Sequence, residues 1–279
     1  MKHVAIALTL MLSATPALSD CPAPEAMKEA AQAWLSGGTL PDPGVTSADD
    51  AACAYTAYRQ ALSDALGAPV GVKVGFTSPA AQQAFGVPGP VAGALFAPML
   101  LPDSAEISLT GSRMPLYEAD LIVTVGDSAI MQATTRAEAA AALSDLRPFI
   151  ELPDVALEQG LKPDGLSMRA YGVMPWRGAM GAPLAMSDLP DPVADLAALT
   201  VDLKVDGETV GSATGDSLLG HPLDVVLWLV QQGGFDLAPG SVISLGSLGK
   251  LYPAQPGHRI AADYEVGGRT MSVSLTLVP

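Results

Sequence analysis

The chain has 279 residues, of which 14 are Lys or Arg and 29 are Asp or Glu, giving a net charge of -15 at pH 7. Such an acidic surface repels phosphate backbones, so nucleic acid is excluded as a partner. The length fits one large core with a small attached segment, and no fixed-period repeat indicates a solenoid.

Residues 1–19 have the features of a secretory signal peptide. They include a basic start, an apolar run from Val4 to Leu12 and small residues at Ala17 and Ser19. We predict cleavage after Ser19 and a periplasmic or secreted protein. The apolar run is too short to cross a bilayer, and no later segment offers about 18 uninterrupted apolar residues, so no membrane attachment is expected.

Both cysteines, Cys21 and Cys53, lie in the first segment of the exported chain. An oxidising compartment favours a disulfide between them, with two buried free thiols as the alternative. On the chain-entropy model, closing a loop of this length stabilises the fold by roughly 3 to 4 kcal/mol. The sequence has no CxxC motif and no histidine near either cysteine of the exported chain, which argues against a thiol catalyst or a cysteine zinc site.

A helical segment is expected over residues 20–67. Stretches 24–36 and 47–66 have helical composition, and a Gly-Gly pair and two prolines separate them. Ser47 and Asp50 have the spacing of a capping box at the start of the second helix.

Residues 68–279 are dominated by short β-prone runs, which predict a mostly antiparallel β body. The joins LKVDGETVG and YEVGGRTMSV carry the Asp-Gly and Gly-Gly signals of tight hairpins. The segment 156–195 is rich in Gly, Pro and Met and is interpreted as a long loop over a site. Helices are predicted at 78–85, 135–144 and 221–232. Strands are predicted at 70–76, 93–97, 105–110, 117–125, 147–152, 199–205, 208–213, 241–245, 258–263 and 270–277.

The stretch YEADLIVTVGD has the composition of a buried strand but carries Glu118 and Asp120 near its start. Side chains two apart in a strand share a face at about 7 Å, so both carboxylates can reach one ion; a wetted strand face is the alternative. Glu151, in RPFIELPD, is a candidate third ligand. Three oxygen ligands suit Mg²⁺ or Mn²⁺, whereas zinc is disfavoured because His221 and His258 are the only histidines after the signal peptide.

Lys73 lies inside the β-prone run VGVKVGFTS. A lysine in such a run is costly unless it is paired or used, so it is a candidate acid/base or carboxylate anchor. The alternative is a lysine whose stem covers apolar surface while its ammonium reaches water.

Two short motifs resemble those of hydrolases. GDSL at residues 215–218 has the letters of a secreted esterase motif, but such enzymes need an acid three residues before a histidine, and neither His221 nor His258 has one. Ser247 and Lys250 have the Ser-x-x-Lys spacing, but they follow a strand instead of opening a helix. His221 is more simply a helix-start residue before Pro222.

The order of several segments resembles one known family. VGVKVGFTSPAAQQAFGV, AGALFAPMLL, YEADLIVTV, FIELPD, LLGHPLDVVLWLV and VISLGSLGKLYPAQPGHRIAADY follow one another as in the 2-keto-4-pentenoate hydratases and 4-oxalocrotonate decarboxylases of the fumarylacetoacetate hydrolase superfamily. The resemblance covers residues 68–277. It implies an α+β fold, a mixed β-roll with an N-terminal helical segment, and makes residues 68–279 the catalytic domain.

The resemblance also implies the site. Glu118 and Asp120 match the family's metal-binding pair, Glu151 matches its third acid, and Lys73 matches a lysine near the substrate. Ser247 falls in the Gly-Ser turn that lines the same pocket. Val91 departs from the pattern, because it stands where these hydratases usually have an active-site aspartate. The family's Asp-Asn-Ala-Ser stretch also has no clear counterpart near residues 166–169.

The expected function is that of an exported, hydratase-like lyase that acts on a small 2-keto or 2-hydroxydienoic acid and uses Mg²⁺ or Mn²⁺. A 2-keto acid can chelate the ion, which would stabilise an enolate. Water addition, decarboxylation and C–C cleavage all pass through such an enolate, so all three remain open. A non-catalytic periplasmic module that binds keto acids is the alternative. A homo-oligomer, a dimer or larger, is expected.

Overall fold

The computed structural model describes residues 21–279, and the predicted signal peptide lies outside the described residues. The described chain begins with two helices that pack together, α1 (Pro24–Leu35) and α2 (Ala48–Leu66). The Ser47 hydroxyl accepts a hydrogen bond from the Asp50 backbone N–H at 3.1 Å, so Ser47 caps α2. Both helices were predicted, and both are confirmed.

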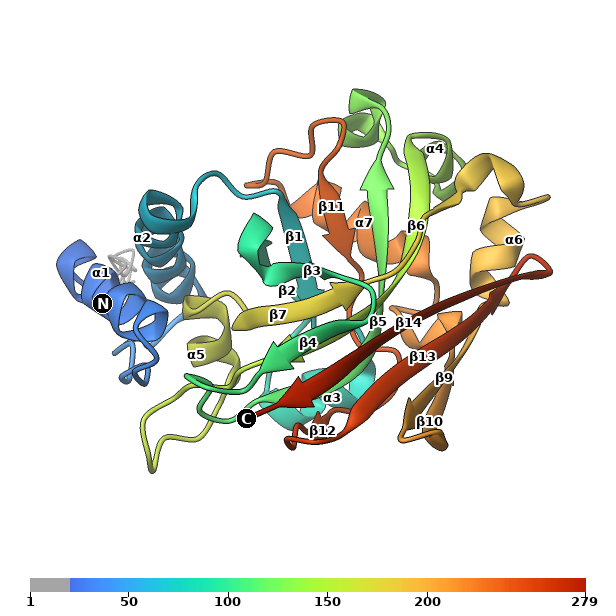
Figure 1. Cartoon of the computed structure of the whole chain (residues 1–279). Helices are drawn as coiled ribbons and strands as arrows, with labels where there is room; N and C mark the ends of the chain where they lie inside the picture. Colours follow the sequence, from blue (N-terminus) through green and yellow to red (C-terminus); the bar gives the residue numbers. More distant parts are fainter. Residues whose placement is uncertain (1–20) are drawn as a thin grey trace, which may run out of the picture.

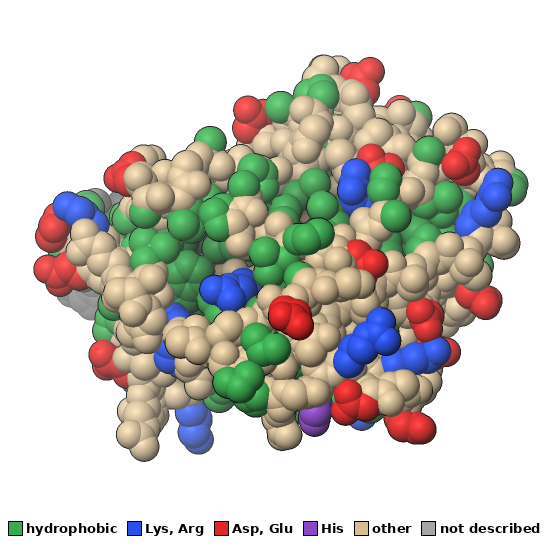
Figure 2. Space-filling view, viewed as in Figure 1, with side chains coloured by type: hydrophobic (Ala, Val, Ile, Leu, Met, Phe, Trp, Pro, Cys, Tyr) green, Lys and Arg blue, Asp and Glu red, His purple; other side chains and the backbone are tan. Residues whose placement is uncertain are grey.

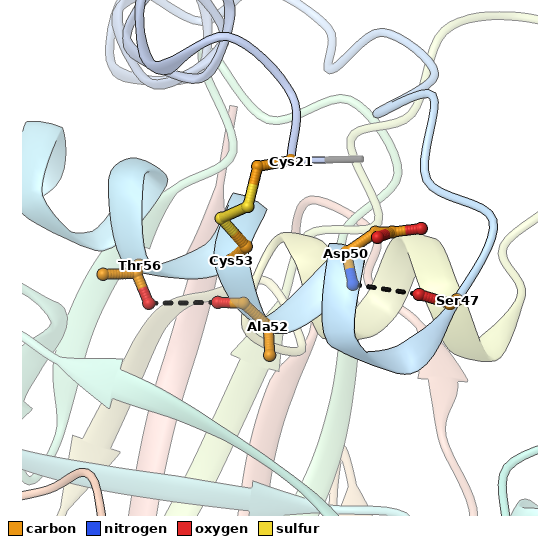
Figure 3. Close-up of a disulfide and its surroundings, with 6 residues drawn as sticks. All are labelled: Cys21, Ser47, Asp50, Ala52, Cys53 and Thr56. Atoms are coloured by element: carbon orange, nitrogen blue, oxygen red, sulfur yellow. Dashed lines mark hydrogen bonds between the residues drawn. A yellow bond between two sulfur atoms is a disulfide. The ribbon is translucent and has the colours of Figure 1, made fainter. Parts of the chain in front are cut away.

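A disulfide joins Cys21 to Cys53, with the two Cα atoms 5.7 Å apart (Figure 3). Cys53 lies within the first two turns of α2, close to the cap formed by Ser47. The bond therefore fastens the segment that precedes α1 to the start of α2. The predicted disulfide is confirmed.

Within residues 21–279 the strands form two sheets (Figure 1). The larger sheet contains β1 (Gly71–Gly75), β2 (Val91–Leu95), β3 (Leu100–Pro102), β5 (Leu116–Val125), β6 (Leu143–Pro153), β7 (Pro175–Met180), β8 (Leu184–Ala185), β11 (Val242–Ser244) and β12 (Tyr252–Pro253). Its main order is β2-β1-β11-β5-β6-β7-β3, with β12 paired to β5 and β8 to β6. The β1–β11 and β3–β7 pairs are parallel and the others are antiparallel.

The smaller sheet packs across the larger one, against β5, β6 and β7. It contains β4 (Ala105–Ser108), β9 (Thr200–Val205), β10 (Glu208–Thr214), β13 (Arg259–Val266) and β14 (Arg269–Val278), in the order β10-β9-β13-β14-β4. Two-residue turns at Asp206-Gly207 and Gly267-Gly268 have positive φ at both positions and close the two predicted hairpins. Each of the ten predicted strands overlaps an observed one, and the predicted α+β class with a mixed β-roll is confirmed.

The remaining helices pack around the sheets. They are α3 (Pro79–Phe85), α4 (Arg136–Ala141), α5 (Gly165–Ala170), α6 (Pro192–Ala197) and α7 (Pro222–Gln232), with short 3-10 turns at Ala97–Met99, Ser128–Gln132, Met186–Asp188 and Gly215–Ser217. Helix α5 contacts α2 and β2, whereas α4, α6 and α7 contact one another. His221 precedes α7, and its Nδ1 accepts a hydrogen bond from the Leu223 backbone N–H at 3.0 Å. The helix-start interpretation of His221 is therefore confirmed.

The two sheets pack together through contacts of β13 and β14 with β6, and the buried core also includes residues of α1, α2 and α7. Phe149 of β6 and Tyr264 of β13 are among the largest fully buried side chains. No helix described between residues 21 and 279 is both long and apolar enough to cross a membrane.

The prediction of a long loop over residues 156–195 is wrong. This segment contains α5, β7, β8 and α6, and β7 pairs with both β6 and β3. Gly178 of β7 lies so close to the Phe149 ring that a Cβ would clash with it. The glycine at position 178 is therefore explained by tight packing within a sheet and does not indicate a loop. The predicted helix 135–144 is also too long, because α4 ends at Ala141 and β6 begins at Leu143.

Candidate metal and catalytic site

Three acidic side chains come together on neighbouring strands β5 and β6. Glu118 and Asp120 are two residues apart on β5, and Glu151 of β6 is the direct register partner of Glu118. Each residue is at most 2% exposed, and one carboxylate oxygen from each lies within 4.8 Å of the others. These positions are buried, so the wetted-face alternative for Glu118 and Asp120 is wrong.

Lys73 reaches the same cluster from β1. Its ammonium Nζ lies 2.8 Å from Glu118 Oε1 and also contacts Glu151 Oε2. Lys73 is only 4% exposed, so its ammonium does not reach open water, as the alternative interpretation required. The buried lysine therefore pairs with two of the three acids.

Asp120 is held by a separate set of hydrogen bonds. Its Oδ2 accepts from the Ser244 hydroxyl of β11 at 2.5 Å, and its Oδ1 accepts from the backbone N–H groups of Gly246 at 3.0 Å and Leu121 at 2.6 Å. The pKa of Asp120 is raised to about 7, mainly by burial and also by nearby Glu118, whereas Lys73 and the Ser244 hydrogen bond oppose the shift. Gly246 has a φ of +105° and packs against Thr77, where a side chain would clash.

Tyr264, on β13 of the smaller sheet, donates hydrogen bonds to the two strands that carry the acids. Its hydroxyl lies 2.6 Å from the Asp120 carbonyl oxygen and 3.1 Å from that of Phe149, the register partner of Asp120. One phenol therefore ties β5 to β6 beside the acids. No sequence pattern marks Tyr264 or Ser244 as a site residue, because their roles arise from contacts between strands distant in the sequence.

The acidic cluster has the properties of a site for a divalent cation. One ammonium faces three carboxylates, so two negative charges stay uncompensated when all four groups are ionised. Within residues 21–279, the buried oxygens Glu118 Oε2 and Glu151 Oε1 have no hydrogen-bond partner. Buried carboxylate oxygens without partners are costly, and hard cations such as Mg²⁺, Mn²⁺ and Ca²⁺ prefer oxygen ligands. The residues therefore fit such an ion.

A cavity of about 150 Å³ opens beside Lys73 and Glu118, and we call it the Lys73 cavity. Ser247 also lines it, so the structure brings Lys73 and Ser247 to one cavity. Lys73 and Glu118 are the only charged side chains among the described residues that line it. The apolar part of its lining consists of Phe76, Ala81, Phe85, Leu116, Pro153, Val155, Met168, Val173 and Leu251.

Two non-glycine residues of the Lys73 cavity have backbones in the left-handed region. Phe76 has a φ of +58° and Val173 a φ of +56°, and the β-branched Val173 is especially unfavourable there. Val173 also packs against Gly75, where an added Cβ would lie 2.9 Å from Val173 Cγ1. Strained residues persist only where surrounding packing holds them, so this wall of the cavity is rigidly defined.

The other sequence candidates lie elsewhere. Val91 is on β2 opposite Gly75, but it lines a separate hollow and not the Lys73 cavity. Both ring nitrogens of His221 are engaged with backbone groups, Nδ1 with the Leu223 N–H and Nε2 with the Val193 carbonyl at 2.9 Å. His221 therefore cannot activate Ser217 of the GDSL stretch, which removes the esterase interpretation.

Comparison with known proteins agrees with this architecture. Residues 51–273 match the fumarylacetoacetate (FAA) hydrolase C-terminal family model, which spans most of the chain. The chain belongs to this family. The 2-keto-4-pentenoate hydratase 1 of Dechloromonas aromatica (strain RCB) is 30% identical over 195 residues, which cover 68% of this chain and 72% of the relative.

Two solved structures have a similar fold. The 4-oxalocrotonate decarboxylase from Pseudomonas putida G7, complexed with magnesium and adipate, aligns with a TM-score of 0.78 at 24% identity and covers 91% of this chain and 97% of its own. The fumarylpyruvate hydrolase from Pseudomonas aeruginosa, in complex with Mn²⁺ and pyruvate, aligns with a TM-score of 0.59 at 17% identity and covers 74% of this chain and 88% of its own. The protein is thus a hydratase-like enzyme of the fumarylacetoacetate hydrolase superfamily.

Proposed function

We propose that this protein is a Mg²⁺- or Mn²⁺-dependent enzyme that adds water to a small 2-hydroxydienoic acid, or acts on the corresponding 2-keto acid. The observation that carries this proposal is the buried cluster of Glu118, Asp120 and Glu151 with Lys73 at the edge of a small cavity. The hydratase relatives, at 28–30% identity, support hydration over the other reactions of the superfamily.

The three carboxylates would hold the ion, and Lys73 would transfer a proton to or from the substrate. When bound, a divalent ion would withdraw electron density from the 2-oxo group and so acidify C3 of a 2-keto acid. Lys73 is the basic side chain that lines the cavity, so we assign to it the transfer of a proton at C3. Ser247 is placed to hydrogen-bond the substrate, since it lines the same cavity.

The lining of the Lys73 cavity supports a small substrate with one carboxylate. Its volume of about 150 Å³ is small beside the roughly 300–1,000 Å³ of typical ligand pockets. Apart from Lys73, no cation among the described residues lines it, so a second carboxylate at the far end of a substrate would have no partner. A short unsaturated or alkyl chain fits the apolar wall.

A turnover assay tests the proposal. Purified protein with Mg²⁺ or Mn²⁺ should consume 2-hydroxypenta-2,4-dienoate, followed by its ultraviolet absorbance, and produce 4-hydroxy-2-oxopentanoate. The second candidate is a module that binds keto acids without turning them over; its support is the sequence difference at Val91, which stands where the resembling hydratases usually have an acid but lies outside the Lys73 cavity. Binding of a 2-keto acid without turnover of any 2-hydroxydienoate would support that second candidate.

Export and oligomerisation complete the proposal. The Cys21–Cys53 disulfide supports an oxidising compartment, and intact-mass measurement of protein from the producing cell would show whether the chain begins at Asp20. Figure 2 shows hydrophobic side chains gathered across the middle of one face, around β3, whose residues are partly or fully exposed. Broad apolar areas of this kind commonly mark contacts between proteins, which supports a homo-oligomer that light scattering would detect.

A further inference from the structure

A second hollow, larger than the Lys73 cavity, lies between α2, β2, α5 and the end of α7. Its volume is about 270 Å³, and it shares no lining residue with the Lys73 cavity. Consecutive residues of α5 separate the two spaces, because Met168 lines the Lys73 cavity and Arg169 lines the hollow. We call the second hollow the arginine hollow. Its main side chains are Tyr55, Arg59, Val91, Arg169, Trp228 and Phe235.

The first arginine of this hollow is fixed by aromatic rings. The Arg59 guanidinium lies over the rings of Tyr55, at 5.8 Å, and Phe235, at 5.3 Å. Its Nη1 donates a hydrogen bond to the Gly234 carbonyl at 3.0 Å. These contacts hold the guanidinium in a defined position and use one of its N–H donors, so its other N–H groups remain for a ligand.

The second arginine, Arg169, has no partner among the described residues. Within residues 21–279, no hydrogen bond or ion pair involves the Arg169 guanidinium, although Arg169 is half-buried. No Asp or Glu is among the described residues that line the hollow. In a chain with a net charge of -15, two arginines that have no carboxylate partner within residues 21–279 therefore share one concave space. Such a space attracts an anion.

The aromatic residues define the rest of the ligand. Trp228 and Phe235 are both half-buried and present ring surface to the hollow, and Val91 and Ala92 of β2 add an apolar wall. A few convergent polar groups within an apolar lining are typical of sites for small organic ligands. We propose that the arginine hollow binds a small aromatic carboxylate, whose carboxylate pairs with Arg169 and whose ring contacts Trp228 and Phe235.

Titration calorimetry with sodium benzoate tests this site. Benzoate should bind one site per chain in the wild type, and the Arg169→Gln variant should bind about tenfold more weakly or worse, because it loses a charge-assisted pair. The Arg269→Gln variant, which removes an exposed arginine on β14, should bind like the wild type. Acetate should bind at least about tenfold more weakly than benzoate, because it lacks the ring. Circular dichroism should be used to check that each variant is folded.

The Lys73→Met variant distinguishes the hollow from the Lys73 cavity. Benzoate affinity should be unchanged in this variant, because Lys73 does not line the hollow. Loss of benzoate binding in Lys73→Met with retention in Arg169→Gln would place benzoate in the Lys73 cavity and overturn the proposal. Absence of binding to the wild type at millimolar benzoate, or equal affinity for acetate and benzoate, would also overturn it.

Discussion

Glu118 and Glu151 face each other directly across β5 and β6, and the Lys73 ammonium contacts both. Like charges at opposed positions of a sheet are destabilising, and buried charges are costlier still. A fold that places Asp120 beside this pair needs positive charge at the same point. Lys73 supplies one such charge, and the proposed divalent ion would supply the rest.

Metal binding should depend on the three acids together. Isothermal titration of the wild type with Mn²⁺ should give about one ion per chain, and Glu118→Gln or Glu151→Gln should abolish detectable binding, because each removes an anionic ligand. The exposed acid Glu106 of β4 provides the control variant Glu106→Gln, which should bind normally. Unchanged Mn²⁺ affinity in both cluster variants would exclude this site.

Removal of the Lys73 charge should destabilise the metal-free protein. In the Lys73→Met variant three buried carboxylates lose their cation, so the free energy of unfolding should fall by roughly 3–5 kcal/mol. Saturating Mg²⁺ should reduce this deficit, because the ion restores positive charge. Urea denaturation with and without Mg²⁺ measures both effects, with the exposed Lys162→Met as the control. If Lys73→Met loses the same free energy of unfolding with and without Mg²⁺, Lys73 and the ion do not compensate the same carboxylate charges.

Ser244 and Ser247 should have separable effects. Ser244 orients Asp120 through a 2.5 Å hydrogen bond, so Ser244→Ala should weaken Mn²⁺ binding by about 10- to 100-fold. Ser247 lines the Lys73 cavity without contacting an acid of the cluster, so Ser247→Ala should retain Mn²⁺ affinity. Calorimetry should compare the Mn²⁺ affinities of the two variants. Equal affinities would contradict the positioning role of Ser244.

His221 should make stability depend on pH. Burial lowers the pKa of His221, although its hydrogen bond to the Val193 carbonyl opposes this shift. The fold therefore favours the neutral ring, and this contribution is present above the unfolded pKa of about 6.5 and is lost as the pH falls below it. In urea denaturation between about pH 7 and pH 5, the wild type should lose stability more steeply than His221→Asn, which still caps α7 but cannot titrate. Parallel profiles for the two proteins would contradict this role.

Reduction of the disulfide should weaken the fold. Breaking the Cys21–Cys53 bond should lower the free energy of unfolding by roughly 3 to 4 kcal/mol, because the unfolded chain regains loop entropy. Urea denaturation with and without reductant measures the change. A Cys21→Ser, Cys53→Ser variant should match the reduced wild type and show no further response to reductant. A wild-type midpoint unaffected by complete reduction would contradict the expected contribution.

The acids and the lysine could be singled out as candidates from the sequence, because each is a charged residue in a β-prone run, and Glu118 and Asp120 have the spacing of one strand face. The sequence could not show that Glu151 lies opposite Glu118, since that depends on the register of β5 with β6. Tyr264 was missed because it reaches the site only through packing between the two sheets. The strand β7 was missed because its proline and Gly178 are typical of loops.

The central claim is that Lys73 transfers a proton at C3 of a 2-keto acid. Proton NMR in D₂O measures it directly as deuterium exchange at C3 of 2-oxopentanoate, with protein and Mg²⁺ present. Wild type and Lys162→Met should catalyse exchange, and Lys73→Met should be slower by roughly 10²- to 10⁴-fold, the usual cost of removing a general acid or base. Exchange by Lys73→Met at the wild-type rate, or no exchange by the wild type above the rate with Mg²⁺ alone, would contradict the account.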